Sequence, residues 1–232
     1  MSHAGVTHFT GITNAARTST LAQMGQLDPT KYITFWDDFI HEPFATEWTI
    51  TATSGGSGTS VISTPDVAGG CARITTAADE NDGIFAQTIG ETFLLASTKR
   101  TWIKARFQVG DAAQSDFIVG LHSTDTTPQD ATMRFLFESV DGSAALYFNN
   151  DDNSTDSDSS TVATLEDDTF VSVGAYFDAA GNIQLFKDDV HITTMTSITP
   201  PAAEMAVGFG YLNGAAGAET TDIDYIFVAQ ER

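Results

Sequence analysis

Residues 101–109 alternate between two kinds of side chain, and this alternation constrains the fold more than any other feature of the chain. Successive side chains of a β-strand point to opposite faces, so a period of two predicts a strand with one face buried. One face would carry Trp102, Lys104, Arg106 and Gln108, and the other Thr101, Ile103, Ala105, Phe107 and Val109. A chain built from such segments is expected to form sheets.

Further strand-like runs follow one another from residue 32 to the end of the chain, separated by turn signals. Asp141-Gly142 between two apolar runs is typical of a hairpin, and residues 178–182 mark a second hairpin. The other expected strands are residues 33–39, 48–51, 71–75, 84–89, 117–121, 133–140, 144–148, 170–177, 183–187, 190–194, 205–212 and 222–230. This spacing predicts an all-β, antiparallel sandwich or barrel. The acidic, low-complexity stretch 149–160 predicts an exposed loop.

The first 31 residues are rich in Thr, Ala, Ser and Gly and differ from the rest of the chain. We therefore divide the chain into an extended N-terminal arm, residues 1–31, and a β-sandwich, residues 32–232. Thr20 and Gln23 fit a capping box, which predicts a short helix that Asp28-Pro29 ends. Two interpretations stay open: an arm that docks on a partner, or a loose terminus. A docking arm would use its apolar side chains, Phe9, Ile12, Leu21, Met24 and Leu27.

The charge balance excludes several classes of partner. Lys and Arg number 10 and Asp and Glu number 31, which gives a formal net charge of -21. Affinity for nucleic acid comes largely from Lys and Arg that displace counterions, so no nucleic-acid partner is expected. An anionic membrane surface would be repelled as well. A plain interpretation, solubility or adaptation to salty water, accounts for the same charge.

Cysteine usage and the N-terminus indicate a protein made in the cytoplasm. Cys71 is the only cysteine, so an internal disulfide is excluded, and a buried, unreactive thiol is expected. The N-terminus, MSHAGVTHFT, lacks the basic and apolar regions of a signal peptide. No apolar run approaches the ~18 residues of a membrane helix.

Short motifs in a fixed order resemble the concanavalin A-like lectin/glucanase jelly roll, in particular its laminarinase-type members. The resemblance covers residues 33–232 and depends on the order and spacing of the motifs. They are Phe35-Trp36-Asp37-Asp38-Phe39 with Trp48, Lys104-Ala105-Arg106-Phe107, residues 170–177 followed by 181–188, and residues 222–228. The resemblance implies an antiparallel jelly-roll β-sandwich.

The chain departs from the catalytic members of that family. Retaining glycosidases need two carboxylates about 5–5.5 Å apart, and those members carry them at alternating positions of one strand. The matching stretch, residues 131–138, holds Glu138 alone, with Arg134 where an acid is expected. We therefore expect no catalytic residues and no enzyme activity.

Calcium is the one cofactor that the resemblance suggests. Family members often hold a structural calcium ion between the first and last strands, and Ca²⁺ prefers oxygen ligands. The residues at matching positions are Asp38, Asp222 and Asp224. No other cofactor is expected.

The Thr/Ala/Gly/Asp-rich composition also resembles that of capsid decoration (cement) proteins of tailed phages. This resemblance implies a structural virion protein on the outer capsid surface, with the major capsid protein as partner and a dimeric or trimeric assembly. A carbohydrate-binding, lectin-like module, for example in a tail, is the alternative and would expose some of Trp36, Trp48 and Trp102 to a glycan. A glycoside hydrolase is the third hypothesis.

Overall fold

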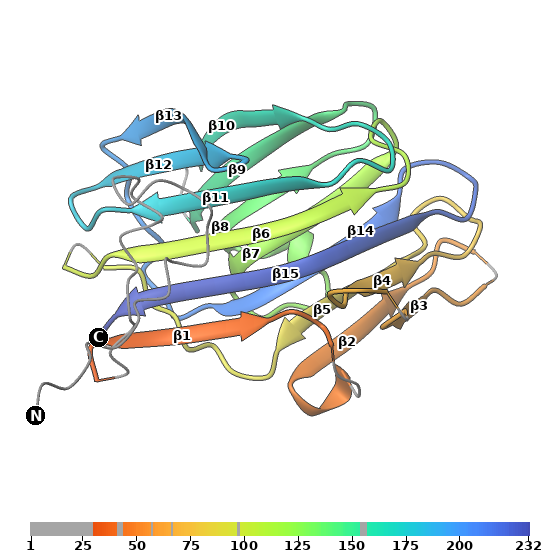
Figure 1. The fold of residues 1–232 in the computed structure, drawn as a ribbon, viewed down its shortest axis with the longest axis horizontal. Coiled ribbons are helices and arrows are strands. Elements are labelled where there is room, and N and C mark those ends of the chain that lie inside the picture. The colour runs from red at the N-terminus through yellow and green to blue at the C-terminus, as the bar shows by residue number, and fades with distance from the viewer. Residues whose placement is uncertain (1–29, 41–43, 57, 66, 97, 154–156) are drawn as a thin grey trace, which may run out of the picture.

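Two antiparallel sheets pack face to face in the computed structural model of the chain (Figure 1). The structure describes residues 30–232 except residues 41–43, 57, 66, 97 and 154–156, so the N-terminal arm with its apolar residues lies outside the described part. The first strand begins at Tyr32, where we placed the start of the sandwich.

Sheet A is the nearer sheet in Figure 1. Across the sheet, it contains β13 (Val190–Thr196), β12 (Asn182–Lys187), β11 (Val171–Phe177), β6 (Thr101–Val109), β15 (Thr220–Glu231), β4 (Ala72–Thr75) and β3 (Val61–Ser63). The eighth strand, β1 (Tyr32–Asp37), pairs with the C-terminal half of the long strand β15.

Sheet B lies behind sheet A in the same view. Across the sheet, it contains β10 (Ser157–Thr164), β9 (Ala145–Asp152), β8 (Met133–Ser139), β7 (Ser115–His122), β14 (Ala206–Asn213), β5 (Gly83–Thr88) and β2 (Trp48–Thr53). Two short 3-10 helices, η2 (Phe44–Thr46) and η3 (Pro128–Asp130), complete the regular elements of the described residues. None of the described helices is long and apolar enough to cross a membrane.

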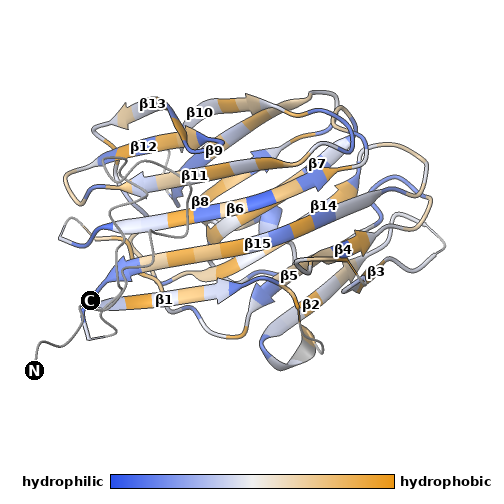
Figure 2. Ribbon diagram, in the orientation of Figure 1, coloured by the Kyte–Doolittle hydropathy of each residue, from blue (hydrophilic) through white to orange (hydrophobic). Residues whose placement is uncertain are grey.

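The alternation that predicted β6 is confirmed for its core face, whereas Trp102 and Lys104 on the other face are buried as well. Its residues Ile103, Ala105, Phe107 and Val109 belong to the core between the sheets, and Figure 2 shows the corresponding change of hydropathy along the strand. Every residue of β7 is buried, as expected for its continuous apolar run. The all-β, antiparallel prediction is therefore confirmed.

One stretch of the prediction is wrong. Residues 149–160 were expected to form an exposed loop, but β9 extends to Asp152 and β10 begins at Ser157, so most of the stretch belongs to a hairpin. At the edge of a sheet, backbone hydrogen bonds to one neighbour hold polar residues in a strand. The residues that follow this stretch hold the hairpin against the sandwich, since Val162 is buried in the core.

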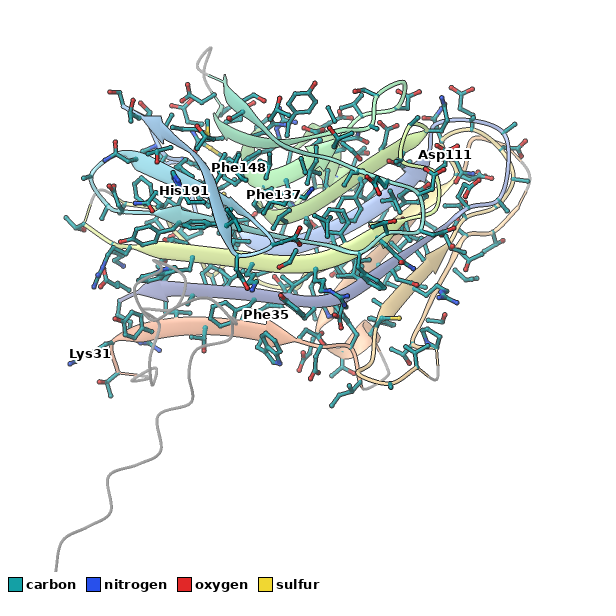
Figure 3. All side chains as sticks on the ribbon, turned by 45° about the horizontal axis from the view of Figure 1, so that its top comes forward. Lys31, Phe35, Asp111, Phe137, Phe148 and His191 are labelled. Atoms are coloured by element: carbon teal, nitrogen blue, oxygen red, sulfur yellow. The ribbon has the colours of Figure 1, made fainter. Side chains whose placement is uncertain are left out.

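Aromatic rings fill the space between the sheets. Phe107 of β6 and Phe117 of β7 stack across the two sheets with their ring centroids 4.1 Å apart. Figure 3 shows Phe137 and Phe148 between the sheets, and their rings meet edge to face. This apolar core fills the space between the two sheets, so a binding or catalytic site is expected on an outer face.

Candidate functional site

The outer face of β8 is the place where the family resemblance would put catalytic carboxylates. Arg134, Leu136 and Glu138 point there, since the alternate residues of β8 enter the core. Glu138 is 6% exposed and accepts a hydrogen bond from the amide Nδ2 of Asn149. Arg134 lies 3.5 Å from Glu138 and 3.2 Å from Asp151. The carboxylate is thus held by an arginine and an amide.

A second acid on this face was missed in the sequence. Asp116 of β7 is buried and interacts electrostatically with Glu138. Burial raises the pKa of Glu138, while Arg134 and Asn149 oppose that shift. Burial likewise raises the pKa of Asp116. No motif marks Asp116, because its nearness to Glu138 depends on the register of two strands.

The connection between β7 and β8, residues 123–132, covers this face. Gln87 of β5 exchanges two hydrogen bonds with the backbone of Asp125, at 2.7 and 3.1 Å. Arg134 donates to the carbonyl oxygen of Gln129 at 3.1 Å, and Pro128 is buried. Four outer-face side chains of this sheet form an apolar cluster of their own, Phe85, Ile118, Leu136 and Leu212. The connection therefore covers Glu138 and the middle of β8, and a groove of about 330 Å³ remains beside it, lined by residues 129–132, Arg134, Asp151 and Asn153.

His122 at the end of β7 packs beside this covered region. Its ring is fully buried and lies directly over Gly208 of β14, where a Cβ atom would overlap the ring. Its Nδ1 is 2.9 Å from the carbonyl oxygen of Ser123. Burial lowers the pKa of His122, and the acids Asp125 and Glu91 only partly oppose this shift. The histidine is therefore a neutral packing residue at ordinary pH.

The outer face of sheet A carries a row of ion pairs. Lys104 of β6 is 2.6 Å from Asp189, and Arg106 pairs with Asp224 of β15. The row continues to Asp222, which accepts hydrogen bonds from Arg73 at 2.6 and 2.7 Å and from Gln108 at 2.9 Å. Lys104, Arg106 and Gln108 thus lie together on the outer face of β6, as the alternation predicted, and Trp102 at the start of the strand is buried in an aromatic cluster.

Two of the three carboxylates proposed for calcium, Asp222 and Asp224, pair with arginines. Asp222 binds Arg73, Asp224 binds Arg106, and Asp38 does not join them in a metal-binding group. Within the described residues there is no group of three His, Cys, Asp or Glu side chains that could hold a metal ion. Cys71 lies nearby; its burial and the acid Asp222 raise its pKa to about 11, so the thiol stays protonated.

An open groove adjoins this row. It has a volume of about 520 Å³ and is lined by Lys104, Arg106, Ser172, Asp188, Asp189, Asp224 and Tyr225. At its border Trp36 of β1 stacks on Tyr225, with ring centroids 5.4 Å apart and planes at 21°. Trp36 is 46% exposed, whereas Trp48 and Trp102 are buried. Phe170 is also exposed and lies under the guanidinium of Arg106. Aromatic and charged groups therefore meet solvent together on this face.

Comparison with known proteins identifies the fold of the chain but no family. No protein-family model and no curated protein sequence matches the chain. The solved structures that resemble it include an endo-1,3-beta-glucanase from Streptomyces sioyaensis, with a TM-score of 0.56 and 14% identity over 88% of this chain and 98% of the glucanase. The carbohydrate recognition domain of Emp47p gives a TM-score of 0.59 and 11% identity over 87% and 98% of the two chains. Peanut lectin gives a TM-score of 0.53 and 10% identity over 86% of this chain and 97% of the lectin.

These likenesses define the class of fold to which the chain belongs. It is the concanavalin A-like jelly roll, a sandwich that the matched glucanase and lectins share. The fold expected from the sequence motifs is thus confirmed. Function has to be argued from the two outer faces, because one fold can host many activities.

Proposed function

We propose that the chain is a non-enzymatic structural protein that binds the outer surface of an icosahedral phage capsid and stabilises or decorates it. The observation that carries the proposal is the state of Glu138 on the outer face of β8, where it is buried, paired with Arg134 and covered by the β7–β8 connection. A glycosidase needs two carboxylates that reach its substrate. A sandwich closed at this place is better suited to binding than to catalysis.

The charge of the chain supports a place outside the particle. A formal net charge of -21 disfavours contact with packaged nucleic acid. The major capsid protein is the proposed partner, and the chain would act as a dimer or trimer on the virion, after synthesis in the host cytoplasm. Several copies joined around a symmetry axis would bind more tightly than one copy, through avidity.

The N-terminal arm is the proposed capsid-binding segment, and of its five proposed contact residues Phe9 and Ile12 are farthest from the sandwich along the chain. The test is co-sedimentation of the full chain with purified capsids that lack it. We expect the double variant Phe9→Ser/Ile12→Ser to lose co-sedimentation. The control Thr7→Ser/Thr10→Ser, which changes neighbouring residues without removing large apolar groups, should keep it. Equal binding by both variants would overturn the role of the arm.

The absence of enzyme activity is tested separately. We expect no release of reducing sugar from soluble β-1,3- or β-1,4-glucans by the purified chain. If sugar is released and the matched variant Glu138→Gln abolishes the release, the chain is a hydrolase, and the non-enzymatic part of the proposal is wrong.

A second candidate function, glycan binding, is favoured by the groove on sheet A. An exposed indole gives a flat apolar surface for a sugar ring, and the adjacent ion pairs offer donors and acceptors for hydroxyl groups. Trp36 and Tyr225 supply the surface, and Arg106 and Asp224 supply the polar groups. The site would lie on sheet A, opposite to the covered face of β8.

A glycan array decides on this candidate. We expect any glycan retained by the chain to be lost with Trp36→Ala. It should be kept with Val140→Ala, which truncates an exposed apolar residue between β8 and β9 of the other sheet, away from the groove. Retention that survives Trp36→Ala would rule out this groove as the glycan site.

A further inference from the structure

Strand β13 lies at one edge of sheet A. Among the described residues it pairs with β12 alone, so its other side presents backbone N–H and C=O groups to which no described strand is paired. An edge of this kind pairs readily with another chain unless charged side chains, proline or a bulge protect it. From Val190 to Thr196, β13 contains no charged residue and no proline. Its sequence therefore gives this edge little protection against pairing.

The side chains of β13 are exposed, although the strand itself is held in place. None of its seven residues is buried, and two apolar side chains, Val190 and Ile192, are 62% and 45% exposed. Met195 packs against the core, and the ring of His191, labelled in Figure 3, meets that of Phe186 edge to face. β13 is thus a fixed edge with apolar side chains in solvent.

A bulge interrupts the pairing of β13 at one point. The register shifts between Leu185 and Phe186 of β12, which leaves Ile192 as the extra residue of β13. From Thr193 to Thr196 the register is regular. The bulge therefore leaves a regular stretch of the edge available for pairing.

The net charge of the chain limits where two copies can meet. Copies that each carry a formal charge of -21 repel one another over most of their surface, so contact has to be made where charge is absent. Residues 190–203 contain no Asp, Glu, Lys or Arg. Strand β10 lies beside β13 at the same edge of the sandwich (Figure 1) and adds the exposed Ser159, Thr161 and Thr164, while its one acid, Asp158, is half-buried. This edge is an uncharged strip on an acidic molecule, and a second copy carries the same strip.

The charges at the ends of β13 determine how two copies would be oriented. Asp188 and Asp189 form the turn before Val190, whereas the other end of the strand continues into the uncharged Ser197. In a parallel pair, the acidic turns of the two copies would lie side by side and repel each other. In an antiparallel pair they lie at opposite ends of the strand, roughly 20 Å apart, and threonine side chains of the two copies meet across the strands. The antiparallel arrangement is therefore favoured.

We propose that β13 pairs with β13 of a second copy in antiparallel orientation and joins the two A sheets into one continuous sheet. Such a pair is related by a two-fold axis perpendicular to the sheet, so it closes at two copies and keeps both outer faces on the same side. The grooves lined by Lys104 and Arg106 would then open on one side of the dimer, where a partner could contact both at once. The pairing concerns the free chain and holds whether or not that partner is a capsid.

Sedimentation equilibrium of the full chain tests the pairing. An interface built around one strand pair is small, so we expect a reversible monomer–dimer equilibrium between roughly 1 μM and 1 mM. Ile192→Lys/Thr194→Lys should weaken the dimer roughly tenfold or more, because lysines of the two copies would face each other. The control Val61→Lys/Val67→Lys makes the same change of charge in and after β3, at the opposite edge of sheet A, and should keep the dimer. All four residues are exposed, so both variants should fold.

Hydrogen exchange of the unsubstituted chain provides a second readout. The backbone amides of β13 should exchange more slowly at high than at low protein concentration, whereas those of β3 should not change. A chain that stays monomeric over the whole concentration range would overturn the proposal, and so would a dimer that survives the lysines in β13 or that both variants weaken equally. A trimer would contradict it as well, since a two-fold pair of edges closes at two copies. None of these outcomes alters the capsid-binding test with Phe9→Ser/Ile12→Ser.

Discussion

The two outer faces of the sandwich carry similar ion pairs, which differ in their exposure to solvent. On sheet B, Arg134 and Glu138 are covered by the β7–β8 connection, and their side chains are 20% and 8% exposed. On sheet A, Arg106 and Asp224 form the same kind of pair, and their side chains are 40% and 24% exposed beside an open groove. Availability for binding is therefore set by the connections that cross a face more than by the strands beneath it.

The largest difference between the faces should appear when each arginine is replaced. We expect Arg134→Met to cost roughly 3 kcal/mol of unfolding free energy, because it leaves the buried Glu138 and the half-buried Asp151 without their cation. Arg106→Met should cost below about 1 kcal/mol, since its pair is exposed to solvent. Urea denaturation at pH 7 measures both.

The loss in Arg134→Met should also depend on pH. The buried Glu138 already has a raised pKa, and without Arg134 its carboxylate is still harder to keep ionised. Protonation at pH 4 removes the uncompensated charge, so the destabilisation should be smaller at pH 4 than at pH 7. A loss that is equal for the two arginines, or constant with pH, would show that the two faces do not differ as described.

Close packing on the outer face of sheet B gives the next prediction. Gly208→Ala should cost about 2 kcal/mol, because the new methyl group would overlap the buried ring of His122. Gly90→Ala is the matched control: its Cβ would meet nothing closer than 3.7 Å and its φ is not in the left-handed region. Thermal or chemical denaturation compares the two variants, and an equal effect would mean that His122 is not fixed over Gly208.

A smaller effect should follow from the protonation of His122. Burial holds its pKa below the usual value, so the unfolded chain binds a proton at a higher pH than the folded chain does. Its contribution to stability is therefore complete at neutral pH and is lost as the pH falls below the ordinary value of about 6.5. Between pH 7 and 5.5 the unsubstituted chain should lose roughly 1 kcal/mol more than His122→Gln. Parallel pH profiles of the two proteins would contradict this assignment.

The smallest effect on stability is expected on the open face. Trp36→Ala removes an exposed ring that stacks on Tyr225, and such aromatic pairs contribute about 0.5–1.5 kcal/mol. We expect a loss near the lower end of this range by urea denaturation, with the fold kept. A loss as large as that of Arg134→Met would mean that Trp36 is part of the folded framework and not of a binding surface.

Local patterns were sufficient to predict much of the fold. The alternation of residues 101–109 and the hairpin signal at Asp141-Gly142 correspond to β6 and to the turn between β8 and β9. The polar strand β10 was not predicted, because its position depends on pairing with β9. The three-residue strand β3 is too short to give a periodic signal.

Which side chains pair on the two outer faces, and which segments cover them, was harder to predict than the strands. The sequence identified Glu138 and Arg134 as a departure from a catalytic pattern, and the structure shows them paired. It did not reveal that residues 123–132 cover them, since hydrogen bonds such as that between Gln87 and Asp125 join segments distant in the chain. For Asp222 and Asp224, which the family resemblance suggested as calcium ligands, the sequence did not reveal the pairing with Arg73 and Arg106, because these cations lie on other strands.

The central claim, that the chain is a structural component of a virus particle, is tested most directly by its copy number in purified particles, measured by quantitative mass spectrometry with isotope-labelled peptides. The account predicts a copy number comparable to that of the major capsid protein. A chain that is absent from the particles would contradict the account and would leave the groove beside Trp36 as the basis for a free glycan-binding protein.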